Sequence, residues 1–261
     1  MLEVHGLGIE FGGVRALDDV SFRAEPGGVL SVIGPNGAGK TTLFNLVSGM
    51  YRSRTGRVTL EGRDVTGAPA HVLARSGLSR TFQNLQVFFQ MTALENVMVG
   101  CHVHERRGLL AHLLGLPSTG RQNAASCDTA WRLLGDVGLE SYADMPAGAM
   151  PYGALKRLEI ARALASRPTV LLLDEPAAGC NPSETAELDR IIRRIAAAGV
   201  CIVLVEHDIG LVMSLSQRIV VLNYGRKLAE GSPAEIQCNA EVIAAYLGGQ
   251  ADEEVSNAVG A

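Results

Sequence analysis

Residues 34–42 read Gly34-Pro35-Asn36-Gly37-Ala38-Gly39-Lys40-Thr41-Thr42. This stretch satisfies the pattern G-x-x-x-x-G-K-[ST], in which glycines allow backbone N–H groups to turn toward a phosphate. In such a loop the lysine reaches the terminal phosphates, and the hydroxyl of the next residue, here Thr41, binds Mg²⁺. We therefore predict that these nine residues form a phosphate-binding loop.

The sequence on either side of the loop has the pattern of a strand and of a helix. Residues 29–33 form a short apolar run with the length and β-branching of a buried strand, and apolar side chains recur at helical spacing over residues 43–47, before Gly49. A strand, a glycine loop and a helix in this order bring the free N–H groups and the dipole of the helix to the phosphates. A chance glycine turn is the alternative, and the flanking pattern argues against it.

Composition and charge restrict the class of protein. The chain has 261 residues, of which 47% are hydrophobic, enough for a substantial core in one large domain or two small ones. Its net charge is −4 with scattered lysines and arginines, so we expect no nucleic-acid partner. No apolar run approaches the roughly 20 residues that span a bilayer, and the first residues lack signal-peptide features, which favours a cytoplasmic protein. Five cysteines without a C-x-x-C pair indicate free thiols.

Two kinds of hydrophobic pattern predict an α/β fold. Apolar runs without alternation occupy residues 170–173 and 200–205, with a helical stripe at residues 188–195 between them. Such strands, separated by amphipathic helices, predict a parallel sheet that is covered on both faces. Residues 2–22 instead alternate between apolar and polar side chains, which is typical of antiparallel strands. Residues 218–222 add one more strand.

The middle of the chain is helical in pattern. Residues 92–95 have the S/T-x-x-E form of a capping box, and apolar side chains recur at helical spacing from residue 131 to residue 137. Residues 102–123 are the least regular part. The histidines in this part lack the spacing of a metal site, so we expect a solvated helix face there. They are His102, His104 and His112.

These patterns predict an α/β core around the phosphate loop with two additions, an antiparallel β subdomain and an inserted α-helical subdomain. The first part of the core and the β subdomain would occupy residues 1–84, and the helical subdomain residues 85–164. The second part of the core would occupy residues 165–248 and include a final helix near Tyr246. The small and acidic composition of residues 249–261 is typical of a flexible tail.

Polar side chains follow three of the predicted strands. Asp174 and Glu175 come directly after the apolar run that ends at Leu173, at the sheet edge where open α/β sheets bind ligands. In phosphate-loop enzymes the first carboxylate binds Mg²⁺ through water and the next polarises the attacking water. We predict these roles for Asp174 and Glu175. Gln83 and His207 also follow apolar strands and are candidates to orient water or to contact the terminal phosphate.

The order and spacing of these motifs resemble one family over almost the whole chain, the nucleotide-binding subunits of ABC transporters. Residues 34–41 resemble its first nucleotide motif and residues 171–175 its second. Gln83 resembles the glutamine of the Q-loop, and His207 the switch histidine. Phe11 stands where the family has an aromatic residue that stacks on adenine. The resemblance implies an ABC-type fold with a RecA-like phosphate-loop NTPase core, which binds and hydrolyses ATP with Mg²⁺.

The resemblance also implies a role for each polar residue. Mg²⁺ would be held by Thr41, Gln83 and Asp174. Glu175 would activate the attacking water, while His207 and Gln83 would sense the terminal phosphate.

The family's signature, Leu-Ser-Gly-Gly-Gln before a helix, corresponds here to Met150-Pro151-Tyr152-Gly153-Ala154. Gly153 and the helix are kept, whereas the serine and the glutamine are absent. In the family two subunits dimerise head to tail, so Gly153 is expected on the ATP of the partner. The departure favours a different ATPase chain as that partner. Alternatively, Gly153 and the helix N-terminus suffice to hold a phosphate, and the chain pairs with itself.

The long stretch between Glu95 and Trp131 resembles the larger of the two ATPase subunits of bacterial branched-chain amino acid importers, and several segments resemble these importers more generally. They are Arg80–Gln83, Tyr152–Arg162, Asp174–Pro182, Glu206–Asp208 and Ala245–Gly248. This resemblance implies membrane permease subunits, a second ATPase subunit and, indirectly, a periplasmic binding protein as partners, with the chain at the inner face of the plasma membrane. The apolar side chains of Phe88, Phe89 and Met91, in residues 85–91, would contact the permease, and core packing is the alternative for them.

Three other functions share part of this pattern. A related importer for urea or short amides, or a soluble ABC ATPase outside transport, would carry the same nucleotide motifs. A small-molecule phosphate-loop kinase would account for Lys40 and Asp174 but not for the Gly153 segment or His207.

Overall fold

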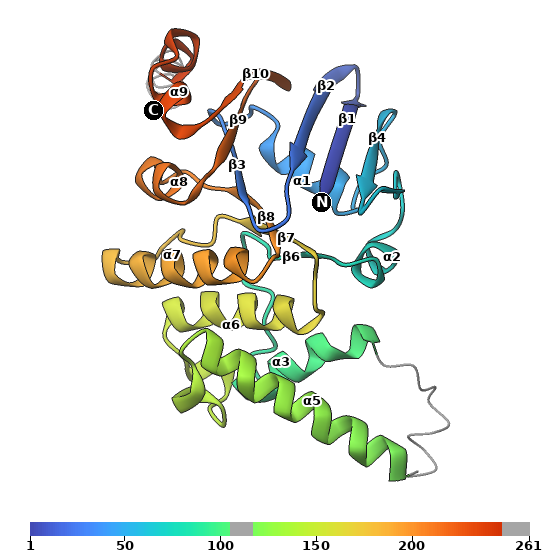
Figure 1. The fold of residues 1–261 in the computed structure, drawn as a ribbon, viewed down its shortest axis with the longest axis vertical. Coiled ribbons are helices and arrows are strands. Elements are labelled where there is room, and N and C mark those ends of the chain that lie inside the picture. The colour runs from blue at the N-terminus through green and yellow to red at the C-terminus, as the bar shows by residue number, and fades with distance from the viewer. Residues whose placement is uncertain (105–116, 247–261) are drawn as a thin grey trace.

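The computed structural model describes residues 1–104 and 117–246 and contains two β-sheets and a layer of helices (Figure 1). The larger sheet has six strands in the order β10-β9-β3-β8-β7-β6. Strands β9, β3, β8, β7 and β6 are parallel, and β10 pairs with β9 antiparallel at the edge. In this order the strands span Arg226–Gly231, Arg218–Asn223, Val29–Ile33, Cys201–Val205, Val170–Asp174 and Leu78–Arg80.

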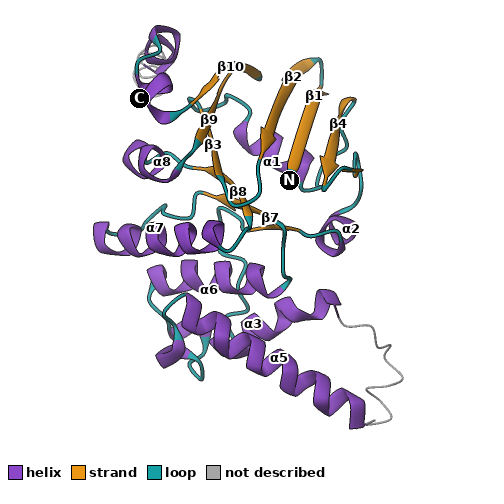
Figure 2. Cartoon of the chain, viewed as in Figure 1, coloured by secondary structure: helices purple, strands orange, loops and turns teal. Residues whose placement is uncertain are grey.

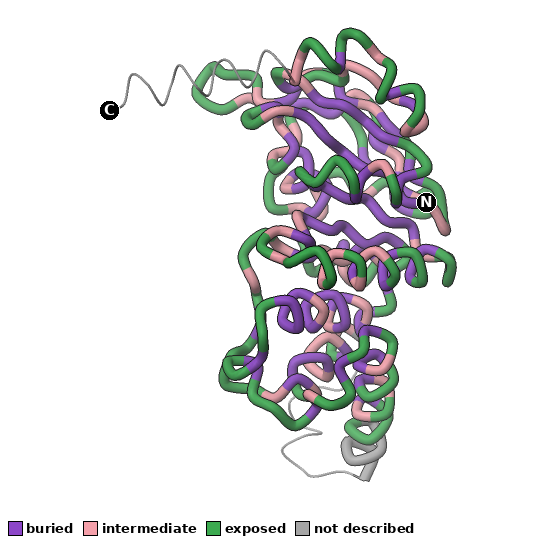
Figure 3. The backbone as a smooth tube through the Cα atoms, turned by 90° about the vertical axis from the view of Figure 1, so that its left-hand side faces the viewer, coloured by how far each residue is buried: buried purple, intermediate pink, exposed green. Residues whose placement is uncertain are grey.

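The centre of the larger sheet is formed by β3, β8 and β7, and every residue of these three strands is buried (Figure 3). Neighbouring strands pair in register, Leu30 with Val203 and Leu171 with Ile202. A strand that is buried on both faces needs apolar side chains at every position. The prediction of a parallel sheet from the unalternating apolar runs is therefore confirmed.

The smaller sheet is antiparallel, with the strand order β2-β1-β4-β5. Its strands span Leu2–Phe11 (β1), Val14–Ala24 (β2), Thr55–Leu60 (β4) and Arg63–Asp64 (β5). Its inner face and the large sheet enclose helix α1 (Lys40–Val47), and one cluster of buried side chains joins all three (Figure 1). Leu7 of β1, Phe44 of α1 and Val203 of β8 belong to this cluster. The phosphate loop is thus fixed to the core on two sides.

Helices form a layer on the other side of the large sheet (Figure 2). Helix α6 (Tyr152–Ala165) contacts α3 (Ala93–Cys101) and α5 (Pro117–Asp136), while α7 (Pro182–Ala197) lies between this group and the sheet (Figure 1). The capping box predicted at residues 92–95 is present, with the side chain of Thr92 accepting from the backbone N–H of Glu95. Every helix in the described part of the chain is too short or too polar to cross a bilayer.

The predictions were wrong or incomplete in three regions. Residues 117–123 were expected to be irregular, but they lie in α5, which spans Pro117–Asp136 in the described part of the chain. Four strands and α-helices of the described chain were not predicted, β5, α8 (Ile209–Leu215), β10 and α9 (Pro233–Gln237). Residues 240–246 form the predicted final helix. The expected tail, residues 249–261, lies outside the described residues.

We predict that Gly100→Ala destabilises the fold, because α3 and α6 meet at this position without room for a side chain. A Cβ on Gly100 would lie 2.2 Å from the carbonyl oxygen of Arg162 and 2.8 Å from Cβ of Ala165. Overpacking of this kind costs about 1–3 kcal/mol, which urea unfolding followed by circular dichroism would measure. Gly135→Ala in α5 is the matched control, since its Cβ would meet the movable carboxylate of Glu140 at 3.1 Å. Equal stability of the two variants would contradict the prediction.

Candidate functional site

A cavity of about 550 Å³ lies over the phosphate loop, at the carboxyl ends of the central strands. Gln83, Glu175 and His207 come from three different strand ends and share this cavity with the loop. The sequence prediction named ten of the lining residues, which are Asn36, Gly37, Ala38, Gly39, Lys40, Thr41, Thr42, Gln83, Glu175 and His207. It did not name the others, which are Val14, Arg15, Ala16, Tyr224 and Gly225.

Two glycines of the loop occupy positions that no other residue fits. Gly34 has φ +154°, and a Cβ there would lie 2.2 Å from the carbonyl oxygen of Leu222 on β9. Gly39 has φ +103°, and its Cβ would lie 2.9 Å from the carbonyl oxygen of Ala16. Gly39 is also the N-cap of α1, so no side chain covers the first N–H groups of that helix. The loop therefore offers backbone donors and a helix dipole to an anion such as a phosphate.

The side chain of Lys40 crosses the phosphate loop and contacts its first residues. Its Nζ donates to the carbonyl oxygens of Gly34, at 2.7 Å, and of Pro35, at 3.0 Å. Burial lowers the pKa of this ammonium group, and the charge of Glu175 opposes that shift. Gly34 and Pro35 thus support the lysine through their carbonyls and do not line the cavity themselves.

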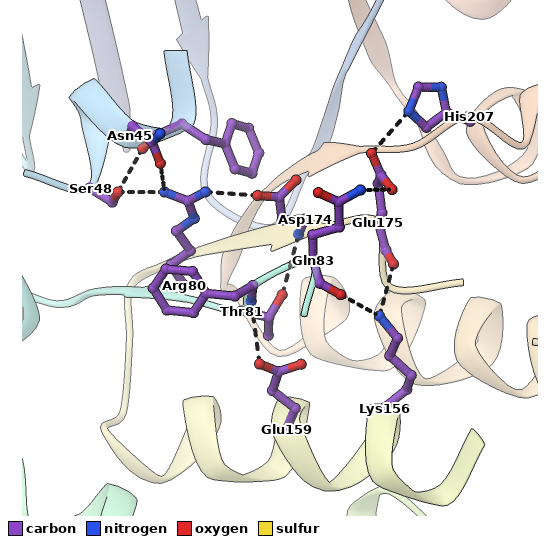
Figure 4. A network of polar contacts seen from close by, with 12 residues as sticks. Asn45, Ser48, Arg80, Thr81, Gln83, Lys156, Glu159, Asp174, Glu175 and His207 are labelled. Carbon is purple, nitrogen blue, oxygen red and sulfur yellow. Dashed lines mark hydrogen bonds and ion pairs between the residues drawn. The ribbon is translucent and has the colours of Figure 1, made fainter. Parts of the chain in front are cut away.

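Glu175, which lines the cavity, is held by two neighbouring side chains (Figure 4). The amide of Gln83 donates to Oε2 at 2.9 Å, and Nε2 of His207 lies 2.9 Å from Oε1. The backbone of Glu175 has φ +50°, a left-handed conformation that is uncommon for a residue with a side chain. This conformation turns the carboxylate out of the strand direction. A strained residue that two side chains orient is a typical feature of functional sites.

Asp174 lies beside this group but does not line the cavity. Its Oδ2 accepts from Nη2 of Arg80 at 2.7 Å, and both side chains are almost fully buried. The predicted metal ligands therefore fall into two groups, Thr41 and Gln83 in the cavity wall and Asp174 behind it. Nothing in the linear sequence pairs Arg80 with Asp174, because they come from two strands that are adjacent only in the sheet.

Two buried charges of α6 hold the segment around Gln83 in place. Nζ of Lys156 lies 3.3 Å from the carbonyl oxygens of both Gln83 and Glu175 and donates to them. The carboxylate of Glu159 accepts from the backbone N–H of Phe82 at 3.3 Å. Sequence reasoning missed both residues, although their spacing of three places them on one face of the helix.

Two predicted contacts lie away from the cavity. Phe11 does not line it, and its ring packs edge-on against Tyr51 with the ring centroids 5.3 Å apart. Gly153 lies in the first turn of α6, where a Cβ would come 2.3 Å from the carboxylate of Glu184. A residue that contacts the nucleotide of the partner must lie outside the chain's own cavity, as Gly153 does. The role of Gly153 on the partner's nucleotide and the contact of Phe11 with adenine stay predictions.

Tyr246, the last described residue, lies close to the first glycine of the phosphate loop. Tyr246 lies beside the backbone of Gly34 and packs against the buried cluster that contains Ile33, and burial raises its pKa to about 12. Sequence reasoning counted Tyr246 as an apolar helix residue.

The histidines of the middle segment form no metal centre in the part of the chain that the structure describes, where no three His, Cys, Asp or Glu side chains gather closely enough. His102 is exposed and lies against the carbonyl oxygen of Met98, at 3.2 Å, while His112 lies outside the described residues.

The burial of Glu159 predicts a pH-dependent stability difference. Burial raises the pKa of this carboxyl above its ordinary value of 4.5, so the folded state favours the protonated form. The contribution of Glu159 to the free energy of unfolding is therefore largest below pH 4.5 and falls as the pH rises through the raised pKa. Glu159→Gln keeps an acceptor for Phe82 but does not titrate. We expect this variant to gain stability relative to the wild type from about pH 5 to about pH 8 in urea unfolding.

Glu235→Gln is the control for this experiment, because hydrogen bonds from Ser232 lower the pKa of Glu235. The wild type then loses the contribution of Glu235 as the pH falls, so the stability difference between variant and wild type must change in the opposite direction. A pH-independent difference for Glu159→Gln would contradict the prediction.

Comparisons with known proteins agree with this geometry. The profile of the ABC transporter family matches residues 17–178, which include the phosphate loop, Gln83, Gly153 and the two carboxylates. A second profile, described as branched-chain amino acid ATP-binding cassette transporter, matches residues 226–252 at the end of the chain.

Similar curated proteins match over nearly their full length. BraF of Pseudomonas aeruginosa, a high-affinity branched-chain amino acid transport ATP-binding protein, is 45% identical over 249 residues, which are 95% of this chain and 98% of BraF. LivG of Escherichia coli, which carries the same description, is 43% identical with the same coverage of both chains.

Solved structures match the fold as well. A nucleotide-free ATP-binding cassette from an ABC transporter superposes with a TM-score of 0.83 and 29% identity, covering 94% of this chain and 98% of that chain. The ADP conformation of an ATP-binding cassette superposes with a TM-score of 0.82 and 29% identity, covering 95% and 98%. With the family profile, the full-length relatives and the cassette geometry in agreement, this chain belongs to the ABC transporter family as one of its ATP-binding, ATP-hydrolysing cassettes.

Proposed function

We propose that this chain is the ATPase subunit that powers a bacterial importer of branched-chain amino acids. The observation that carries the proposal is the similarity to BraF and LivG over nearly the whole length of all three chains. The match of residues 226–252 to a profile described as branched-chain amino acid ATP-binding cassette transporter supports this substrate class over urea or short amides. A soluble ABC ATPase outside transport would share the site but not this carboxyl-terminal segment.

The site fits Mg²⁺ and ATP. The loop has no room for a Cβ at Gly34 or Gly39, and it points the free N–H groups of α1 toward the cavity, as a bound triphosphate requires. Lys40 would exchange its loop carbonyls for phosphate oxygens. Thr41, Gln83 and Asp174 would hold Mg²⁺, which when bound supplies positive charge for phosphoryl transfer. Phe11 would stack on the adenine from the rim.

Hydrolysis in this proposal depends on Glu175. Its carboxylate accepts a proton from the attacking water, and it is aimed by the contacts that Gln83 and His207 make to its two oxygens. Because the same two side chains reach the cavity wall, they also sense the terminal phosphate. Loss of that phosphate would change the hydrogen bonds that hold Glu175.

The proposed partners follow from two surfaces. The side chains of Phe88, Phe89 and Met91 are 46%, 48% and 38% exposed, so core packing does not account for them. They lie close in sequence to Gln83, which lines the cavity. An apolar surface of this kind suits the membrane permease subunits.

The departures around Gly153 support a second, different ATPase chain across the dimer. The chain would then lie at the inner face of the plasma membrane, with a periplasmic binding protein acting indirectly.

Glu175→Gln is expected to bind ATP and to reduce the steady-state ATPase rate by at least about a hundredfold, because the amide cannot accept the proton. Phosphate release by the purified protein and retention of radiolabelled ATP would measure the two effects. Glu140→Gln, at the start of a surface turn, is the control and keeps the wild-type rate. Undiminished hydrolysis by Glu175→Gln would remove Glu175 from the role of base.

The importer itself is tested by purification of the chain from its native membrane, followed by mass spectrometry. We expect two hydrophobic permease chains and a second, shorter ATPase to accompany it. Deletion of its gene should abolish uptake of radiolabelled leucine and valine, with urea uptake as the control. Purification as a lone soluble homodimer, or with nucleic acid, would leave the ATPase and overturn the transport function.

A further inference from the structure

Arg80 forms a buried ion pair with Asp174, one of the residues to which the proposed function gives the metal. We propose that Arg80 is a positioning residue that acts as the counter-charge of Asp174 whenever Mg²⁺ is not bound there, and that it thereby speeds the release of Mg²⁺ with the spent nucleotide. This inference rests on the proposed function, which supplies the nucleotide and the metal.

The contacts of Arg80 tie Asp174 to the helix that follows the phosphate loop. Nη2 of Arg80 donates to Oδ2 of Asp174 at 2.7 Å. Nη1 donates to Oδ1 of Asn45 and to Oγ of Ser48, both at 2.8 Å and both near the end of α1 (Figure 4). The guanidinium group thus forms a bridge between strand β7 and helix α1.

The position of Arg80 is fixed by its surroundings. The guanidinium carbon lies 5.5 Å from the ring centroid of Phe44 and 4.9 Å from that of Phe82, which are distances of cation–π contacts. The side chains of Arg80 and Asp174 are only 6% and 5% exposed. The strands that carry them are adjacent, and the backbone N–H of Asp174 donates to Oγ1 of Thr81 at 3.3 Å. The pair is therefore preorganised.

Because Asp174 is buried, its carboxylate depends on the positive charge of Arg80 for stabilisation. An isolated carboxylate that is removed from water is unfavourable, and loss of one partner from a buried ion pair is strongly destabilising. Mg²⁺ at the same carboxylate supplies another positive charge and reduces this need. Arg80 therefore stabilises the protein more without the metal than with it. Since Mg²⁺ affinity is the difference between these two states, Arg80 weakens retention of the metal.

Two variants of Arg80 test the proposal. Arg80→Met keeps a long side chain between the two phenylalanine rings but removes the charge, and Arg80→Lys keeps the charge but loses the forked contact to α1. Arg157→Met is the matched control, because Arg157 pairs with Glu187 at 2.8 Å in the helical layer, away from the cavity.

The measurement is the affinity of the full chain for a fluorescent ADP, with EDTA and with a series of Mg²⁺ concentrations. The ratio of the two Kd values, EDTA over saturating Mg²⁺, reports the coupling between metal and nucleotide. We expect Arg80→Met to raise this ratio about tenfold and to slow release of Mg²⁺·ADP by a similar factor. Arg80→Lys should give a ratio between those of the wild type and Arg80→Met, and Arg157→Met the wild-type ratio.

A role of Arg80 in folding alone would lower thermal stability but leave the ratio unchanged, which would overturn the proposal. A lower ratio in Arg80→Met would overturn it as well, because Arg80 would then hold Asp174 ready for the metal. If Arg80→Met does not fold, Arg80→Lys decides in the same way, and a ratio at or below that of the wild type overturns the proposal. Failure of the wild type to bind ADP would instead overturn the proposed function.

Discussion

The close approach of the phosphate loop to strand β9 is the constraint on which the site depends. Gly34 passes so near the carbonyl oxygen of Leu222 that only a hydrogen atom fits between them. This contact sets where the loop leaves β3, and Lys40 then crosses the loop to the carbonyl oxygen of the same glycine. The N-terminus of α1 takes its direction from this turn. The backbone, more than any side chain, therefore shapes the phosphate site.

Around this loop the polar groups occupy two layers. The inner layer lines the cavity and contains Glu175 with Gln83 and His207, each of which hydrogen-bonds to the carboxylate of Glu175. The outer layer is buried and contains Arg80 and Lys156, which hold residues of the inner layer or their neighbours by charge-assisted hydrogen bonds. Because the outer layer spans both the sheet and α6, a movement of the helical layer would reach the carboxylate of Glu175 through a few short contacts.

The sequence predicted those features that depend on local patterns. The buried strands β3, β7 and β8, the helix after the loop and the capping box at Thr92 were all expected, since apolar runs, glycines and caps act on near neighbours. Arg80, Lys156 and Tyr246 were missed because their partners are distant in sequence and become neighbours only through sheet pairing and helix packing. β10 was missed because only one of its six residues is buried, so its hydrophobic pattern is weak.

The contact between Tyr246 and Gly34 has a practical consequence for handling the protein. Tyr246 comes after all the recognisable nucleotide motifs in the sequence, yet it lies beside Gly34, the first glycine of the phosphate loop, and supports it. A truncation that removed residues 246–261 as a dispensable tail would also remove this support. The amino terminus, where the ammonium group of Met1 pairs with Glu61 on the small sheet, lies in a different part of the fold from Tyr246. The final helix is therefore part of the nucleotide-binding unit and belongs in any shortened version of the chain.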